Sequence, residues 1–307
     1  MNTVYSILSF LKQVLFTTVS QLFWLLGLIF IFGFILYFLA RFTRNTFAKT
    51  AGTTLDVFIT GWIGTPVHEL GHAFFCIIFR HKIDEIKLFT PNSEDGTLGY
   101  VNHSYDNNSL YQKIGNFFIG IGPIIFGTFI LYALLYFLLP NAKEVLSSIN
   151  SQSKVFVKFS HGEFSNILGS IWITTKNSLS ILFQKENLSN YKFWIFLYFS
   201  MCIASHMELS PPDIKGAWKG LFSIVLLFII INFIIIGIES IGVNEHLGNW
   251  LNYIKIENYS NPINKFVGIL GSFFILATIL SGIIFFITYL ILNIFSIIKG
   301  KGIIHPF

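Results

Sequence analysis

The chain has 307 residues, of which 53% are hydrophobic and only 11% carry a charge. A soluble globular protein normally contains about 25% charged residues, so this composition excludes an ordinary soluble domain and predicts a multi-pass membrane protein. The formal net charge of +5 is small, and lysines and arginines do not cluster with aromatic side chains, so the sequence does not favour nucleic-acid binding.

The first quarter of the chain predicts two membrane spans. Residues 1–18 alternate between apolar and polar side chains, which favours an interfacial helix or a continuation into the first span. Residues 21–40 predict a transmembrane helix, because about 20 residues at about 1.5 Å each cross a hydrocarbon core of about 30 Å. The second span is expected at residues 54–79. Basic residues close the first span on one face of the membrane: Arg41, Arg44 and Lys49.

A polar excursion follows between residues 80 and 112. Apolar and polar residues alternate on both sides of a turn that ends at Gly96, which predicts a β-hairpin that pairs residues 84–90 with residues 97–104. The exposed edge of such a hairpin could hold an extended substrate by strand addition. An ordinary capping hairpin explains the same pattern equally well.

Four more spans and one surface helix are expected in the rest of the chain. The third span, residues 114–139, contains Gly122 and Pro123, which permit either close helix packing or a kink. Apolar residues at roughly helical spacing over residues 164–183 predict a membrane-surface helix. The other three spans are expected at residues 192–207, 218–238 and 266–298. The last of them fits one tilted helix, and a re-entrant or broken segment is the less favoured alternative.

These elements define the predicted fold class, an all-α polytopic membrane protein with about six transmembrane helices, a small membrane-associated β-hairpin and an interfacial helix. The chain divides into an N-terminal segment with the first span (1–52), a core (53–218) and C-terminal transmembrane helices (219–307). Six spans place both termini on one side. The lysines of the C-terminal tail favour the cytoplasmic side, whereas the basic residues after the first span favour the opposite orientation.

The second span carries the pattern His68-Glu69-Leu70-Gly71-His72. Residues four apart project from one face of a helix, so both imidazoles can bind one zinc ion, and Glu69 can accept a proton from the attacking water. A soluble amphipathic helix can carry this pattern by chance. Inside an apolar span, however, two histidines and a carboxylate are energetically costly, and they therefore indicate a functional metal site.

A catalytic zinc ion usually has three protein ligands, so a third residue must come from elsewhere in the chain. The segment between the fourth and fifth spans offers three candidates, His206, Glu208 and Asp213. Asp213 also fits an ordinary helix start, with Ser210 as the N-cap and an acidic residue three positions later. His206 is the rival third ligand, because it too lies at the boundary of a membrane segment.

This histidine helix, together with the acidic and proline-containing stretch two spans later, resembles the site-2 protease family of intramembrane zinc metalloproteases. The resemblance covers roughly residues 54–218. It implies that His68, His72 and Asp213 bind zinc and that Glu69 is the general base.

The resemblance extends to two other motifs. It implies that Gly99-Tyr100-Val101 belongs to a strand that binds unwound substrate, and that Gly122-Pro123 corresponds to the Gly-Pro motif of the family's middle core helix. The chain departs from the family pattern at two positions. Ile214 follows the candidate ligand where the family usually has glycine, and Phe126 stands three residues after the proline where the family usually has asparagine.

The sequence therefore predicts a zinc metalloendopeptidase that hydrolyses peptide bonds of membrane-embedded or membrane-anchored proteins. Its expected cofactor is Zn²⁺, and its expected partners are a membrane-protein substrate and the lipid bilayer, without nucleic acid. The composition and simple architecture suit a multi-pass protein of a bacterial inner membrane. The alternative is a metal-binding membrane protein without protease activity, such as a transporter or a regulatory scaffold, since intramembrane sets of histidine and carboxylate also mark ion pathways.

Overall fold

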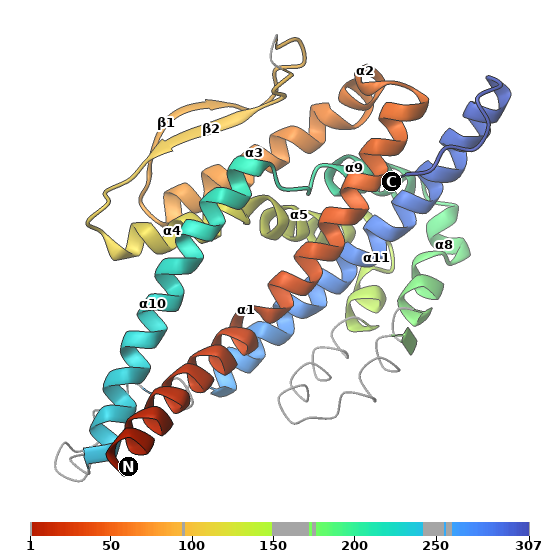
Figure 1. Cartoon of the computed structure of the whole chain (residues 1–307). Coiled ribbons are helices and arrows are strands. Elements are labelled where there is room, and N and C mark those ends of the chain that lie inside the picture. Colours follow the sequence, from red (N-terminus) through yellow and green to blue (C-terminus); the bar gives the residue numbers. More distant parts are fainter. Residues whose placement is uncertain are drawn as a thin grey trace.

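The structure, a computed structural model, describes residues 2–93, 96–148, 172–173, 176–241, 255 and 260–306. Helices make up most of this part of the chain, and they are accompanied by one two-stranded sheet. Figure 1 shows the sheet on the outer side of the helices. The expected class, a helical membrane protein with a small β-hairpin, is confirmed at this level.

Three helices of the described part are long and apolar enough to cross a membrane: α1 (Asn2–Thr50), α10 (Pro211–Ile241) and α11 (Ser260–Ile298). α1 contains no proline, and the prolines of α10 and α11 lie in the first turn. Backbone N–H groups of the first turn have no hydrogen-bond partner within the helix, so proline, which lacks this group, does not interrupt the helix there. Each apolar run therefore continues as one helix. The first residues of the chain continue directly into the first span, and the last apolar run forms a single helix, as expected.

The second and fourth expected spans take other forms. Residues 54–79 comprise the short helix α2 (Thr53–Asp56), a π-helical turn (Val57–Gly61) and α3 (Trp62–Ile78). The fourth span corresponds to α9 (Tyr191–Ser205), whose 15 residues at about 1.5 Å each fall short of a core of about 30 Å. The described part thus holds three candidate spans, or four with one bent pair, and the expected number of six is not confirmed.

That bent pair is the expected third span, which consists of α4 (Leu110–Gly120) and α5 (Gly122–Leu138) with a bend of 59°. Pro123 lies in the first turn of α5, where its fixed φ and missing N–H favour a new helix start. Gly122 allows close packing, because a Cβ atom there would lie 2.7 Å from the carbonyl oxygen of Gly71 in α3. The Gly-Pro pair therefore produces both the close packing and the bend.

The β-hairpin consists of β1 (Lys82–Lys87) and β2 (Tyr100–Ser104), which pair antiparallel with one irregularity in register. The hairpin predicted at residues 84–90 and 97–104 is confirmed, although its strands pair farther from the turn. Figure 1 shows the sheet alongside α3 and α4. Val101 packs against a small buried apolar cluster formed by these two helices, and this contact holds the sheet on the helical body.

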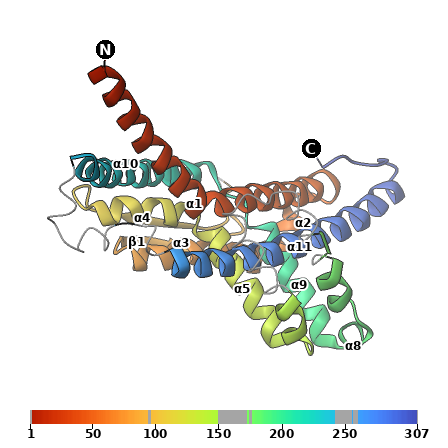
Figure 2. The same cartoon turned by 90° about the horizontal axis from the view of Figure 1, so that it is seen from below.

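The helices form two groups. Figure 2 shows α1, α3, α4, α10 and α11 roughly in one layer, from which α5, α9 and the short α8 (Lys185–Leu188) project to one side. α1 packs along α11, and α4 packs along α10. The main core lies where the two groups meet. Its fully buried large side chains come from both groups: Leu36, Leu131, Leu135, Phe193, Phe196, Phe274 and Leu280.

The termini lie at opposite ends of α1 (Figure 1). The C-terminal tail folds back on the end of this helix, where Lys49 Nζ donates to the carbonyl oxygen of His305 (3.0 Å) and Asn45 Nδ2 to that of Pro306 (3.3 Å). The expectation of six spans with both termini on one side is not confirmed. Two basic groups that the sequence assigned to opposite sides, the end of α1 and the C-terminal tail, are neighbours.

The membrane-surface helix expected at residues 164–183 lies mostly outside the described residues. Residues 176–182 are helical, in agreement with the last part of that prediction. The division of the chain into residues 1–52, 53–218 and 219–307 stays a prediction.

Candidate metal centre

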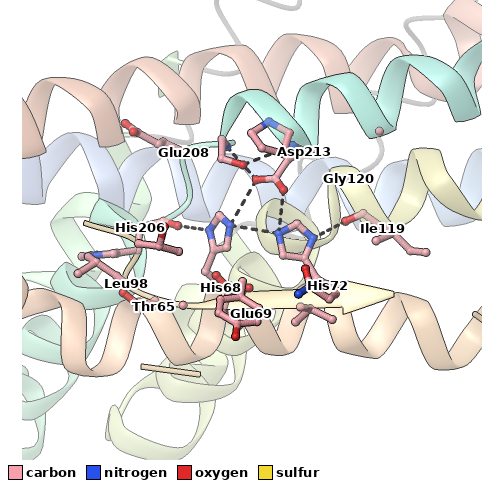
Figure 3. A pocket seen from close by; sticks show the side chains of 18 of the residues that line it. Thr65, His68, Glu69, His72, Leu98, Ile119, Gly120, His206, Glu208 and Asp213 are labelled. Carbon is pink, nitrogen blue, oxygen red and sulfur yellow. Dashed lines mark hydrogen bonds and ion pairs between the residues drawn. The ribbon is translucent and has the colours of Figure 1, made fainter. Parts of the chain in front are cut away.

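Two histidines of α3 and one aspartate of α10 come together inside the helical body. His68 and His72 stand one turn apart, and Figure 3 shows both rings pointing from α3 toward Asp213 at the start of α10. The Nε2 atom of His72 lies 3.2 Å from Asp213 Oδ1, and that of His68 lies 3.5 Å from Asp213 Oδ2. The two Nε2 atoms are 3.2 Å apart. The three residues predicted as ligands thus form one cluster that could hold a metal ion.

Backbone carbonyl groups fix the tautomer of both rings. His68 Nδ1 lies 2.7 Å from the carbonyl oxygen of His206, and His72 Nδ1 lies 2.8 Å from that of Ile119. A carbonyl oxygen only accepts hydrogen bonds, so each Nδ1 carries the proton and donates it. Each Nε2 atom of the neutral rings therefore presents a lone pair to the centre of the cluster. Such outer contacts orient histidine ligands in metalloproteins.

Asp213 has two roles in this arrangement. Ser210 caps α10, since its Oγ accepts a hydrogen bond from the backbone N–H of Asp213 (3.3 Å) and its own N–H donates to Asp213 Oδ2 (2.8 Å). This is a capping box, with the acidic side chain three residues after the cap. The sequence left two alternatives for Asp213, an acidic residue at a helix start or a third metal ligand. In the structure, Asp213 both lies at the start of α10 and faces the two histidines. The cap holds the carboxylate in the orientation that faces His68 and His72.

Close contact between α4 and α10 determines the position of Asp213. A Cβ atom at Gly120 would lie 2.5 Å from the carbonyl oxygen of Asp213 and 2.8 Å from the side chain of Ala217. Only glycine therefore permits this approach of the two helices. Because α4 also supplies the carbonyl group of Ile119, the same helix positions both His72 and the carboxylate that faces it.

His206, the rival third ligand, does not enter the cluster with its side chain. Its carbonyl oxygen accepts the hydrogen bond from His68, and its ring turns away, with Nδ1 3.1 Å from the carbonyl oxygen of Cys202. The ring packs closely against α3, where a Cβ atom at Gly64 would lie 2.5 Å from His206 Nδ1. His206 Nε2 is buried without a hydrogen-bond partner among the described residues. His206 is therefore a positioning residue for His68 rather than a member of the cluster.

A cavity of about 570 Å³ opens beside the cluster and contains the other predicted site residues. Glu69 lines it from α3, and residues 96–103 of the hairpin line its other side, including Gly99, Tyr100 and Val101. A Cβ atom at Gly99 would lie 2.9 Å from Glu69 Cγ, so glycine allows the chain to pass directly over the carboxylate-bearing side chain. Tyr100 donates from its hydroxyl group to Glu85 Oε1 (2.7 Å) across the sheet. The cavity thus joins the metal cluster, the candidate base and an extended segment.

A second pair of histidines, which the sequence analysis did not single out, lies at the far end of the hairpin. His81 Nε2 donates to the carbonyl oxygen of Gln112 (2.9 Å), which leaves His81 Nδ1 to accept from His103 Nδ1 (3.0 Å). His103 also lines the cavity. Burial, with an added effect of the neighbouring His81, lowers the pKa of His103 to about 4, and burial lowers the pKa of His81 as well.

Arg44 connects three segments around the site. It forms ion pairs with Asp56 of α2 (3.5 Å) and with Glu208 (3.2 Å), in the segment that carries both His206 and the cap of α10. Nothing in the sequence distinguishes Arg44 from an ordinary basic residue at the end of a span. The carbonyl groups of Ile119 and His206 carry no sequence signal at all, because every residue has one.

The fold and the cluster together define a helical membrane protein with a small sheet and a partly buried cluster of His68, His72 and Asp213. No protein-family model, curated protein or solved structure matches the chain.

Proposed function

We propose that the protein is a zinc-dependent endopeptidase that hydrolyses peptide bonds of membrane-embedded or membrane-anchored proteins. The observation that carries this proposal is the convergence of His68, His72 and Asp213 beside a cavity that also contains Glu69. Two nitrogen lone pairs and a carboxylate that face one another repel unless positive charge lies among them. A proton can bridge only one of these contacts at a time, whereas one divalent cation satisfies all three.

The spacing of the three residues fits zinc. Ligand atoms about 2.1 Å from a tetrahedral zinc ion lie about 3.4 Å apart. The observed separations among His68, His72 and Asp213 are 3.2, 3.2 and 3.5 Å. Two imidazoles and one carboxylate are also a ligand set found in catalytic zinc sites, which keep a further position open for chemistry. The two carbonyl acceptors supply the outer shell that such sites use.

The groups around the metal cluster have different roles in the proposed hydrolysis. A bound zinc ion would supply polarisation of the scissile carbonyl group and would make water more acidic. Glu69 accepts the proton of the attacking water and transfers it to the leaving amine. The carbonyl groups of His206 and Ile119 keep the histidine rings in place during the reaction. Asp213 contributes negative charge, and its cap hydrogen bond with Ser210 prevents rotation of the carboxylate.

We infer the kind of substrate from the surroundings of the cavity. A peptide bond inside a transmembrane helix is inaccessible, because its carbonyl group is hydrogen-bonded within the helix, so the substrate must be locally unwound. The segment with Gly99, Tyr100 and Val101 lies along the cavity and offers an extended backbone against which such a stretch can pair. The long apolar helices and the composition further support a multi-pass protein of a bacterial inner membrane.

The first test is the metal content of the protein purified in detergent. We expect about one zinc ion per chain in the wild type and in Glu69→Gln, and strong depletion in His68→Ala. The matched control is His305→Ala, which removes an imidazole far from the cluster and leaves the zinc content unchanged. A wild-type chain that takes up no zinc when zinc is supplied would remove the basis of the proposal.

The second test separates protease activity from metal binding alone. New protein N-termini are identified by mass spectrometry in membranes of cells that produce either the wild type or Glu69→Gln. We expect termini within or next to transmembrane segments in the wild type only, since the variant retains metal but lacks the base. Equal sets of new termini, despite bound zinc in both proteins, would instead favour a metal-binding protein without protease activity.

A further inference from the structure

A second cavity lies between the end of α1 and the start of α10, separate from the metal cluster. Its volume is about 1020 Å³. Arg44, Glu208 and Ser210 line both cavities and form the wall between them. None of the three predicted zinc ligands and none of the described hairpin residues lines the second cavity. It therefore needs an explanation that the proposed peptidase reaction does not supply.

Positive charge dominates this cavity. Four basic side chains line it, Arg41 and Arg44 from α1 and Lys215 and Lys219 from α10. The two acidic residues on its wall, Asp56 and Glu208, both form ion pairs with Arg44. In the part of the chain that the structure describes, the other three cations have no ion-pair partner. Arg41 donates only to the hydroxyl group of Tyr37 (2.8 Å).

Holding three cations around one cavity has an electrostatic cost. Lys215 and Lys219 stand four residues apart and therefore lie on one face of α10, which destabilises a helix when the charges are alike. Arg41 approaches the same space from the neighbouring helix. An anion in the cavity removes this repulsion. Because lysine and arginine can each donate several hydrogen bonds to one group, an anion with several oxygen atoms, such as a phosphate, fits best.

Apart from the polar residues Asn45, Thr53 and Ser210, the rest of the lining is apolar or aromatic. Ile214 and Trp218 belong to the same face of α10 as the two lysines, and Val57 and Leu209 complete the apolar part. Trp218 is 64% exposed, and Tyr37 also lines the cavity; both are residue types enriched where a membrane meets water. The cavity lies at the ends of two candidate membrane spans, α1 and α10. Its ligand must therefore combine an anionic group with an apolar part.

We propose that this cavity binds the headgroup of an anionic membrane phospholipid. Arg41, Lys215 and Lys219 contact the phosphate, and Ile214 and Trp218 contact the first part of the acyl chains. Basic pockets between transmembrane helices recognise lipid headgroups by this combination of charge and apolar surface. The proposal is independent of the peptidase reaction, because no residue that contacts the lipid belongs to the metal cluster or acts as the base.

The test measures lipid binding to the full-length protein in neutral detergent by mass spectrometry of the intact complex. Phosphatidylglycerol is titrated against the wild type and against the double variant Lys215→Gln/Lys219→Gln. We expect phosphatidylglycerol to bind at least tenfold more tightly than phosphatidylcholine. A basic residue near a membrane contributes about a fivefold gain in affinity for anionic lipid, so the double variant loses roughly 25-fold. Inorganic phosphate at the same concentration displaces little of the lipid, because it lacks the apolar part.

The matched control is Lys185→Gln/Lys192→Gln, which removes the same charge from exposed positions in α8 and α9. We expect it to bind phosphatidylglycerol like the wild type, and the charge-preserving variant Lys215→Arg/Lys219→Arg to retain most of the affinity. All variants should keep the helix content of the wild type by circular dichroism, which shows that they fold. Equal binding of the two lipids, an equal loss in the control variant, or full displacement by inorganic phosphate would overturn the proposal.

Discussion

Asp213 combines a structural hydrogen bond with a position that faces two histidines. Its Oδ2 atom accepts the backbone N–H of Ser210, and the same carboxylate lies within 3.5 Å of both Nε2 atoms. A residue with two roles complicates mutagenesis, because loss of the cap and loss of a metal ligand both lower stability. The choice of substitution decides whether the two effects can be separated.

Asp213→Asn separates them. Asparagine keeps an oxygen that can accept the N–H of Ser210, so the start of α10 remains formed, but the charge that zinc requires is lost. Removing an outer-shell partner typically weakens metal binding about 10- to 100-fold, and loss of a direct ligand costs more than that. We therefore expect the zinc affinity of Asp213→Asn to fall by more than about 100-fold, measured by competition with a chelator, with little change in helix content by circular dichroism.

His206→Ala provides the contrasting case. The carbonyl oxygen that holds His68 belongs to the backbone and survives the substitution, so we expect a decrease in zinc affinity of less than about tenfold. The same chelator competition tests this. If His206→Ala lost its zinc while Asp213→Asn kept it, the assignment of the third ligand would be reversed.

The histidine pair of the hairpin makes stability depend on pH. Burial lowers the pKa of both His81 and His103, the latter to about 4, below the value of about 6.5 in an unfolded chain. Both rings are therefore neutral in the folded protein. The contribution of His103 to stability is fully present above a pH of about 6.5 and is lost as the pH falls toward 4, because the unfolded chain then binds more protons. The lowered pKa of His81 acts in the same direction.

For His103 this shift corresponds to at most about 3 kcal/mol, and we expect roughly half, because the ring is partly exposed and solvent screens it. Thermal unfolding in detergent at pH 7 and pH 4.5 should show a larger decrease in Tm for the wild type than for His103→Gln. Hydrogen exchange at the amides of β2 should report the same loss locally. A variant with the same pH dependence as the wild type would show that other groups control acid stability.

At the scale of elements, the contact between α4 and α10 controls the geometry of the metal cluster. Gly120→Ala would place a methyl group 2.5 Å from the carbonyl oxygen of Asp213, so one helix must shift. Overpacking of this kind typically costs about 1–3 kcal/mol. We expect lower stability together with weaker zinc binding. Gly216→Ala is the matched control, because it lies in the early turns of α10 with no atom within 4 Å of the added methyl group.

The elements also show which features can be predicted from sequence. The helix with His68 and His72, the start of α10 and the hairpin depend on local signals: i, i+4 spacing, a cap followed by an acidic residue, and alternation around a glycine turn. These local predictions agree with the structure. The predicted number of six spans is not confirmed, because an apolar run such as residues 54–79 fits a transmembrane helix and a packed, partly π-helical segment equally well.

Contacts in the site between residues distant in the sequence could not be predicted from local sequence patterns. Whether His206 or Asp213 faces the two histidines depends on how α9 packs against α3 and how α10 packs against α4, which no local pattern encodes. Hydrogen bonds to the carbonyl groups of Ile119 and His206 depend on backbone position alone. The ion pairs of Arg44 join residues far apart in the chain, and composition near a span cannot reveal them.

At the scale of the whole molecule, basic residues collect at one end of the long helices. The end of α1 lies beside the C-terminal tail, through the hydrogen bonds of Lys49 and Asn45. Arg44 connects the same end of α1 to the segment before α10. Lysines and arginines of α1, α10 and the C-terminal tail therefore share this end: Arg41, Arg44, Lys49, Lys215, Lys219, Lys299 and Lys301. From the positive-inside rule we predict that this end faces the cytoplasm and that the N-terminus lies on the opposite side of the membrane.

The two ends of the chain should therefore be labelled from opposite sides of the membrane. Cys76 and Cys202 are buried and are first replaced by alanine, and a short tag with one cysteine is then added before Met1 or after Phe307. In sealed vesicles that expose the extracytoplasmic face, a membrane-impermeant maleimide should label the N-terminal tag at once and the C-terminal tag only after permeabilisation. Both tags label in permeabilised vesicles, which controls for reactivity. Labelling of both tags from one side would mean an even number of crossings and would contradict the arrangement of α1 and α11.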